Sequence, residues 1–598
     1  MYKSEKLYSM KNIKIFTAIF ATCLLLSCND KLDLQTDGRI TKDQVFTDYN
    51  RTRGYLNSCY GFCPAPYMDR ASYTDEAQDA DDVTPDSKYI NWYGGSATSI
   101  TYATYSADGS PWGKLFEGIR KCNVFIESIK TATVYATEAE KGQWTAQAYT
   151  LRALYYLQLI KRYGGVPIID KPVDINHDFS TDKKAKFSEV VKMILADCDK
   201  ALTYPATQSG FSWNIYDNQF GIMTRGVAYA IKSQAVTYAA SPLWADGTYT
   251  WAMATEINKE ALSQCLTNGA YKLFDVVPAA TVAQNPYAFY FITSSNDQRT
   301  VDKETIYQSG VQMAVWRYAG MPTNPSMDKS GPCPTQDLVD SYEMANGETP
   351  ITGYSDASRL VPIINSASGY DPANPYTGRD PRFYASIYYN GSVRYLDQPA
   401  GKKVETFVGG LEEISDVSRK NTRTGYYQRK FNNYKSNLSS NADGAVRLFR
   451  LAELYLNFAE SANQSAGPDV AISAGSLTIS ARDAVNAVRT RAGMPPFPSG
   501  MTKEAFEKKY RNERRIELAL EEHRFFDVRR WKVLDQTDKF VTGMKITKSG
   551  TVLTYTRFKF SDRNCSSTKY LMYPIDQAEV DKVIGLGGAN WQNPGWLD

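Results

Sequence analysis

Apolar residues recur at spacings of three and four along much of the chain before residue 270, which is the period of an amphipathic helix. The segments with this pattern are 113–130, 143–162, 188–202, 224–240 and 252–267. The second of them stops at Gly164-Gly165, with Pro167 beyond, which is a common signal for the end of a helix. Alanine at close approaches and aromatic residues in the gaps predict paired helices like those of tetratricopeptide repeats, without a clean 34-residue period.

The periodicity is lost between residues 271 and 445, where Gly, Pro, Asn and Tyr cluster around short strand-like runs. Two such runs are 305–308 and 383–389, and helical patterns return at 447–464, 479–492 and 502–533. We therefore predict a mainly α fold, a tetratricopeptide-like α-α superhelix scaffold with a large insertion of loops and short strands. The predicted regions are an N-terminal helical region 28–270 and a C-terminal region 271–598, the latter made of an irregular ligand-facing part 271–445, closing helices 446–535 and a final segment 536–598.

The first 27 residues have the pattern of a secretory signal peptide. Lys11 and Lys14 precede an uncharged, mostly apolar run of 12 residues, 15–26, which is too short to span a membrane. For such a signal peptide, Met10, directly before Lys11, is a better first residue than Met1. The run ends in Leu-Leu-Ser-Cys, which resembles a bacterial lipobox and predicts lipidation of Cys28. The alternative is a plain signal peptide with an incidental cysteine.

Charge and composition exclude several classes of protein. Residues 1–27 hold four Lys and one Glu, so the remaining chain has 64 basic and 64 acidic side chains. A net charge of zero argues against nucleic-acid binding, which needs a basic face. Only two His, His177 and His523, argue against a histidine-built metal or nucleophilic site. Seven Cys follow Cys28 without a C-x-x-C pair, and we expect Cys59 and Cys63, four apart, to be able to meet on one helix face.

No catalytic or cofactor motif is present in the sequence. The phosphate-binding loop and the G-x-G-x-x-G, G-x-S-x-G and H-E-x-x-H motifs are missing. The acidic stretch 75–86 lacks the spacing of an EF-hand, so calcium binding has no supporting motif and no cofactor is predicted. A glycosidase needs only two carboxylates at the right separation, which a sequence does not show. We therefore predict a protein that is not an enzyme and keep a glycoside hydrolase as a less favoured alternative.

Aromatic residues among polar and Gly-rich loops are the candidates for ligand binding. Flat rings stack on the apolar faces of sugars or on peptide side chains, while neighbouring polar groups fix orientation. Trp92-Tyr93 beside Gly94-Gly95, and Trp316 with Tyr318, have the least core-like surroundings. We predict that these four aromatic residues form a binding platform. The alternative for each ring is that it packs into the core.

Acidic and basic residues alternate along residues 513–531 at steps of three and four, which places them on one face of a helix. They are Glu513, Arg514, Glu517, Glu521, Arg524, Asp527 and Arg530. We predict that this row forms ion pairs inside the protein, between packed helices. The alternative is an exposed binding face.

Several blocks, in this order behind a lipobox, resemble the SusD/RagB family of outer-membrane nutrient-uptake lipoproteins. They are W-G-K-L-F-E-G-I-R-K-C-N at 112–123, L-R-A-L-Y-Y-L-Q-L-I-K-R-Y-G-G-V-P at 151–167, P-T-Q-D-L-V-D-S-Y-E-M-A-N-G at 334–347, R-D-P-R-F at 379–383, L-A-E-L-Y-L-N-F-A-E-S-A-N at 451–463, N-A-V-R-T-R-A-G-M at 486–494, the helix at 513–531, Y-P-I at 573–575 and N-P-G at 593–595. The resemblance spans residues 28–598.

The resemblance implies a helical, non-enzymatic binding protein at the cell surface, anchored by lipid to the outer membrane. It implies a SusC-like TonB-dependent β-barrel as partner, to which the protein passes captured oligosaccharides or, in some members, peptides. Members that bind glycans use loop aromatics in neighbourhoods that correspond to residues 60–110 and 280–320. The matching blocks are scaffold motifs, so they transfer no individual ligand contact, and a peptide-binding RagB-like subunit stays an alternative to a glycan-binding one.

Overall fold

The computed structural model describes residues 40–64, 68–174, 176–213, 220–277, 285–292, 300–308, 313–314, 320, 328–393, 403–432, 443–444 and 447–596. The chain divides into two compact units, Met1–Thr52 with Ala132–Tyr135, and Arg53–Thr131 with Ala136–Asp598. The candidate site and the ion-pair network described below belong to the second unit. The predicted regions 28–270 and 271–598 remain predictions.

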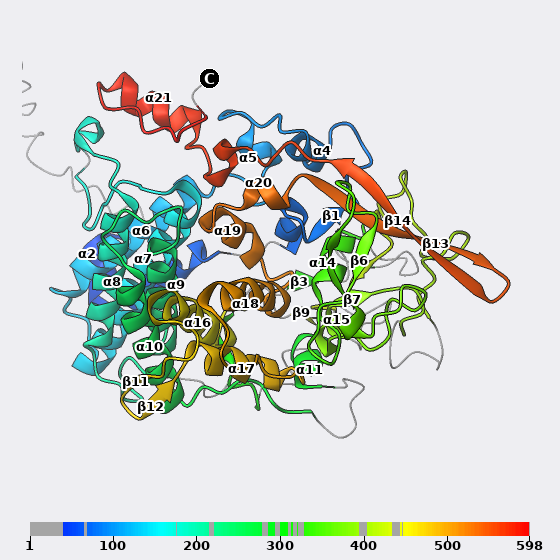
Figure 1. Cartoon of the computed structure of the whole chain (residues 1–598). Coiled ribbons are helices and arrows are strands. Elements are labelled where there is room, and N and C mark those ends of the chain that lie inside the picture. The colour runs from blue at the N-terminus through cyan, green and yellow to red at the C-terminus, as the bar shows by residue number, and fades with distance from the viewer. Residues whose placement is uncertain are drawn as a thin grey trace, which may run out of the picture. The chain divides into compact units, whose positions relative to one another are not determined.

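Helices form most of the regular structure (Figure 1). The α-helices are α2 (Lys42–Thr47), α3 (Tyr49–Cys59), α4 (Lys88–Tyr93), α5 (Tyr102–Tyr105), α6 (Trp112–Ile129), α7 (Glu138–Tyr163), α8 (Phe187–Leu202), α9 (Arg225–Ala239), α10 (Trp251–Thr267), α11 (Pro286–Ile292), α14 (Gln336–Ser341), α15 (Pro381–Ser386), α16 (Leu451–Ala466), α17 (Ala481–Arg491), α18 (Lys503–Glu517), α19 (His523–Arg530), α20 (Leu534–Thr537) and α21 (Gln577–Gly585). The 3₁₀ turns are η1 (Tyr60–Phe62), η2 (Met68–Tyr73), η3 (Phe179–Thr181), η5 (Ser366–Ser368) and η6 (Thr568–Leu571).

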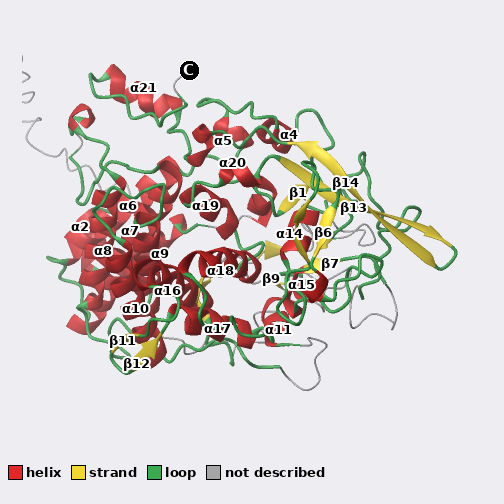
Figure 2. Ribbon diagram, viewed as in Figure 1, coloured by secondary structure: helices red, strands yellow, loops and turns green. Residues whose placement is uncertain are grey.

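Helices α6 to α10 pack one against the next in chain order, and α10 then packs on α16 and α16 on α17. Figure 2 shows these helices gathered together, apart from most of the strands. The close contacts depend on small residues. A Cβ at Gly118 of α6 would come within 2.7 Å of the ring of Tyr155 on α7. The mainly α, tetratricopeptide-like fold predicted from the sequence is confirmed.

The predicted helix 143–162 is longer in the structure and ends where the sequence indicates. Thr137 caps α7, and its side chain and that of Glu140 form a capping box. Gly164, with φ +72°, ends the helix. The apolar residues form one stripe in the sequence, but α7 is buried along most of its length because α6, α8 and α9 all contact it.

Strands pair two by two in antiparallel fashion within the described part of the chain. The pairs are β1 (Ala77–Asp79) with β4 (Pro332–Pro334), β2 (Thr305–Gln308) with β10 (Arg447–Arg450), β3 (Met313–Ala314) with β9 (Asp443–Gly444), β5 (Ile351–Tyr354) with β6 (Pro362–Ile364), β7 (Ile387–Tyr388) with β8 (Tyr427–Gln428), β11 (Ile472–Ala474) with β12 (Leu477–Ile479), and β13 (Phe540–Ser549) with β14 (Val552–Asp562).

The strand predicted at 305–308 is confirmed as β2, whereas the strand predicted at 383–389 is wrong over most of its length. Asp380 caps the helix α15 there, and Pro381 follows at its first position, so the chain is helical up to Ser386. Only Ile387–Tyr388 forms a strand. The β13–β14 hairpin lies inside the predicted final segment 536–598, where the sequence pattern indicated no strand.

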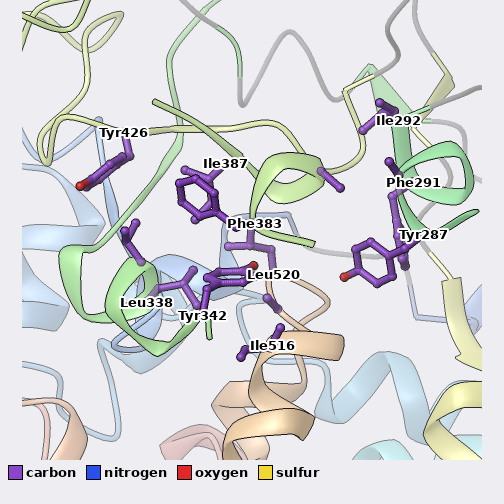
Figure 3. Packing of buried hydrophobic residues seen from close by; sticks show 14 of the residues in the cluster. Tyr287, Phe291, Ile292, Leu338, Tyr342, Phe383, Ile387, Tyr426, Ile516 and Leu520 are labelled. Carbon is purple, nitrogen blue, oxygen red and sulfur yellow. The ribbon is translucent and has the colours of Figure 1, made fainter. Parts of the chain in front are cut away.

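The helix predicted at 502–533 is two helices, α18 and α19, because the chain turns between them. Leu520 and Glu522 have left-handed φ angles of +63° and +69° in this turn. A distant residue stabilises it, since the backbone N–H of Leu520 donates to the carboxylate of Glu76 at 3.2 Å. Figure 3 shows Ile516 and Leu520 lying close to Tyr342 and Phe383, so apolar packing also favours the turn.

The charged row at 513–531 forms ion pairs in the interior, as predicted. Some of its partners are far away in the sequence, and others lie within the row, where Asp527 pairs with both Arg514 and Arg530. Glu513 binds Arg382 and Arg489, and Arg514 binds Asp527 at 2.8 Å. Arg450 lies at the centre of the network, with contacts of 2.7–2.8 Å to Glu304, Glu517 and Glu521.

Glu76 is buried, and no cationic group among the described residues is within ion-pair distance of its carboxylate, which affects its ionisation. Burial raises the pKa of Glu76 from its ordinary value of 4.5 to about 7, although Arg515 and Arg524 act in the opposite direction. Between about pH 4.5 and pH 7 the folded state therefore binds more protons than the unfolded state. The stability that Glu76 contributes is therefore present below about pH 4.5 and is lost as the pH rises to about 7.

We expect Glu76→Gln to remove this pH dependence. The amide cannot ionise, and its carbonyl oxygen can still accept the Leu520 N–H. The variant should be more stable than the natural chain by about 2–3 kcal/mol at pH 8 and equally stable near pH 4.5. Urea unfolding at pH 4.5 and pH 8 measures the difference. Glu256→Gln, at a residue whose side chain is 64% exposed, is the control that should change neither value.

Candidate functional site

Trp92 and Tyr93, two of the four aromatic residues predicted to bind ligand, lie in the interior. They end α4, and their side chains are 1% and 5% exposed. The Trp92 ring contacts Tyr73, Tyr102 and Tyr570 at centroid distances of 5.0–5.7 Å. The Tyr93 hydroxyl donates to the carbonyl of Ser72 at 2.8 Å. In this arrangement neither ring is open to a ligand, which matches the core alternative stated above.

Trp316, Tyr318 and the lipidation residue Cys28 lie outside the described residues, so their roles remain predictions.

The acidic stretch 75–86 contacts basic residues of other segments. Asp75 binds Arg524 at 2.7 Å and Asp82 binds Arg423 at 2.5 Å. Asp79 lies 3.3 Å from Lys329. Among the described residues, no group of three or more His, Cys, Asp or Glu side chains is arranged to hold a metal ion.

A cavity of about 710 Å³ opens between α6, the segment 167–182 that includes η3, and the C-terminal segment with α21. Its lining is mostly apolar and includes Trp112, Phe116, Ile119, Phe179, Val583 and Trp591. We call it the α6–α21 pocket. Its volume is within the range of about 300–1,000 Å³ that is usual for small-molecule sites.

Aromatic rings in tilted and edge-to-face contact lie at the start of α6, in the lining of the pocket. Trp112, the first residue of α6, lies 4.8 Å from the ring of Phe116 and 5.1 Å from that of Tyr163. The helical period places Phe116 one turn after Trp112, on the same face. Pro111, which precedes Trp112, supplies the N-cap position of α6.

Hydrogen bonds hold the segment 167–182, which lines another side of the pocket, against α6. The Asn123 amide donates to the carbonyls of Ile169 and Lys171 at 2.9 and 3.2 Å. Arg152 of α7 donates to the Asn123 carbonyl oxygen at 2.6 Å and pairs with Asp197 at 2.7 Å. The Arg152–Asp197 ion pair thus joins α7 and α8 and, through Asn123, supports the segment 167–182. Neither α7 nor α8 lines the pocket itself.

The rim combines an exposed aromatic ring with charges of both signs. Phe179 is 41% exposed, and its ring meets that of His177 edge to face at 4.7 Å. His177 is bound in turn to Asp182 at 3.0 Å. The charged side chains that line the pocket are Glu117, Arg120, Lys171, Asp182, Glu579 and Lys582.

Lys184 binds the C-terminal segment that lines the pocket. Its ammonium group donates to the carbonyl of Trp591 at 2.9 Å and to the side-chain oxygen of Asn593 at 2.5 Å. Burial lowers the pKa of Lys184 to about 8.

The arrangement suits recognition of a molecule that has a flat apolar face and polar edges. Apolar rings would contact the face, and the charged rim would hydrogen-bond the edges. Trp112 opens one of the blocks that resemble the SusD/RagB family, but no pattern in the sequence marks it as a ligand contact. No pattern in the sequence indicates Phe179 or Trp591, because residues some 70 and 480 positions from Trp112 meet only in the folded chain.

Fold and pocket together define a helical scaffold of the tetratricopeptide-like type that carries an aromatic-lined pocket. Comparison with known proteins agrees with this fold. The profile of the SusD family matches residues 288–596, just over half of the chain, and a second profile, described as starch-binding associating with outer membrane, matches residues 41–209. The chain belongs to the SusD family.

Individual relatives are distant in sequence. SusD-like protein P38 of Formosa agariphila is 23% identical over 192 residues, which are 32% of this chain and 37% of that protein. The chain thus matches little more than a third of the length of this curated relative. A SusD-like protein of Bacteroides fragilis is 24% identical, with a TM-score of 0.73 over 93% of this chain and 99% of that one. A SusD-like carbohydrate binding protein of the same organism is 21% identical, with a TM-score of 0.65 over 90% and 99%.

No helix among the described residues has the length and the apolar character needed to cross a membrane.

Proposed function

We propose that the protein is a cell-surface lipoprotein that captures oligosaccharides and delivers them to a SusC-like TonB-dependent transporter of the outer membrane. Membership of the SusD family supports the proposal, as do the starch-binding description of the profile that matches residues 41–209 and the carbohydrate binding of a structural relative. Lipidation at Cys28 would anchor it, with the folded chain facing outward. The protein would act without catalysis and without a cofactor.

The observation that carries the binding part of the proposal is the aromatic lining of the α6–α21 pocket. Sugar rings have apolar C–H faces that stack on aromatic rings, and hydroxyl edges that bond carboxylates and cationic groups. Phe179 offers a partly exposed ring, and Trp112 and Phe116 also line the pocket. The predicted platform at Trp316 and Tyr318 is a second candidate for the same ligand.

We expect Phe179→Ala to weaken oligosaccharide binding about tenfold, since loss of one stacked ring corresponds to about 1.4 kcal/mol. Titration calorimetry with the best ligand from a glycan array measures the effect. Because Phe179 is partly exposed, the melting temperature should change little.

Tyr135→Ala is the matched control, since Tyr135 is 96% exposed and does not line the pocket. Trp316→Ala is measured in parallel. Loss of affinity only in Trp316→Ala would place the ligand on the predicted loop platform and contradict the pocket. Loss of affinity in neither variant would contradict both placements.

A further inference from the structure

The charged side chains that line the α6–α21 pocket fall into two groups. Glu579 and Lys582 pair with each other at 2.7 Å, and Asp182 is bound by His177 at 3.0 Å. The second group is exposed and makes no ion pair within the described part of the chain: Arg120, Lys171 and Glu117. Of the charges that are open to a ligand, two are therefore positive and one is negative.

One stripe of α6 places a free cation beside the aromatic rings of the pocket. Trp112, Phe116, Arg120 and Asn123 follow one another at steps of four and three, which keeps them on one face of the helix. Arg120 lies one turn beyond Phe116, about 5.4 Å along the helix axis. A sugar ring is of similar width, so a sugar that stacks on Phe116 brings one edge to Arg120.

The second cation reaches the pocket from the segment that faces this stripe. The amide of Asn123, one turn after Arg120, donates to the carbonyl of Lys171 at 3.2 Å. Arg152 in turn donates to the Asn123 carbonyl oxygen at 2.6 Å. The side chains of Arg120 and Lys171 therefore start from neighbouring points on the wall of the pocket.

A different face of α6 is covered by α3 and η1. The ring of Tyr55 on α3 stacks on that of Phe125 on α6, with centroids 6.4 Å apart, and neither residue lines the pocket. Cys59 ends α3 and Cys63 follows η1, so the expectation that these two cysteines meet on one helix face is wrong. The packing of α3 and η1 thus leaves the stripe with Arg120 open to a ligand.

We infer that the pocket selects oligosaccharides that contain uronic acids, and that Arg120 and Lys171 bind the carboxylate of the sugar. The inference rests on the proposed function, because it names the substrate class of the same pocket. A uronic acid combines the apolar ring face of a neutral sugar with one carboxylate at its edge. The planar guanidinium group of Arg120 can donate two parallel hydrogen bonds to that carboxylate, and Lys171 adds a second positive charge.

The test compares each of three acidic trisaccharides, tri-galacturonate, tri-guluronate and tri-mannuronate, with its uncharged methyl ester. Titration calorimetry at pH 7 on the chain from Asn29 to Asp598 should show at least one acid bound about tenfold more tightly than its ester. Arg120→Met and Lys171→Met should each reduce this ratio of affinities about threefold. In the double variant the acid and the ester should bind alike, a result that a purely structural role of the two residues would not produce.

Two further variants check the role of charge. Glu117→Gln removes the free anion of the pocket, so it should raise the ratio of the two affinities. Lys114→Met is the matched control, because Lys114 is an exposed cation of the same helix that does not line the pocket. This control should leave the ratio unchanged.

Equal binding of all three acids and their esters, or an unchanged ratio in the double variant, would overturn the inference. Neutral oligosaccharides that bind in the same experiment would then leave the proposed capture function standing. Absence of binding by every oligosaccharide, neutral or acidic, would overturn both.

Discussion

Replacing Arg450 with methionine should destabilise the protein by about 3–5 kcal/mol, because it removes one partner of a buried ion-pair network. Arg450 is 2% exposed and bonds three carboxylates, those of Glu304, Glu517 and Glu521. Lys430 and Arg491 would remain near them, but no methionine atom can replace the five hydrogen bonds of the guanidinium group. The midpoint of urea unfolding at pH 7 measures the loss.

The loss should become smaller in acid. Against the effect of burial, Arg450 and Lys430 hold the pKa of Glu521 at about 2, below its ordinary value of 4.5. In the natural chain this contribution is present above about pH 4.5 and is lost as the pH falls to about 2. The variant lacks it, so the two chains should approach each other in stability below pH 4.5.

Arg482→Met is the matched control, because it breaks an ion pair with Asp469 whose side chains are 25% and 37% exposed. A surface pair contributes about 0–1 kcal/mol, so the control should be nearly as stable as the natural chain. Equal losses in the two variants would show that the Arg450 network does not stabilise the interior as described.

Trp92→Ala should cost about 3–5 kcal/mol of stability, since it leaves a cavity in place of a large buried ring. The ring contacts Tyr73, Tyr102 and Tyr570, and Phe525 lies 6.5 Å away. We expect a much lower urea midpoint, and unchanged ligand affinity for the fraction that stays folded. Trp92→Phe, which retains an aromatic ring, should lose less stability.

A Trp92→Ala variant with unchanged melting and lost ligand affinity would contradict the buried position. That outcome would favour the exposed binding platform predicted from the loop pattern. Tyr93→Ala would then be the next variant to measure.

The helical half of the fold could be predicted because its signals are local. Thr137, Gly164 and the apolar period between them mark α7 within one segment of the sequence. The charged row at 513–531 also indicated buried ion pairs. Its break at Leu518–Glu522 could not be predicted, because the residue that bonds the turn, Glu76, lies more than 400 positions earlier.

The candidate site was harder to predict for a related reason. Trp92 looks like a loop residue beside Gly94-Gly95, and its burial depends on rings that come from both ends of the chain, such as Tyr73 and Tyr570. The α6–α21 pocket likewise combines Trp112, Phe179 and Trp591, which no spacing rule connects. Patterns in a sequence identify local elements, whereas a site of this kind depends on contacts across the whole chain.

Capture of oligosaccharides without turnover is measured on the soluble chain from Asn29 to Asp598. The chain is applied to arrays of oligosaccharides and oligopeptides, and released reducing ends are measured in parallel. We expect binding to oligosaccharides, no binding to peptides and no release of reducing ends. Binding to peptides alone, or release of reducing ends from a bound glycan, would contradict it.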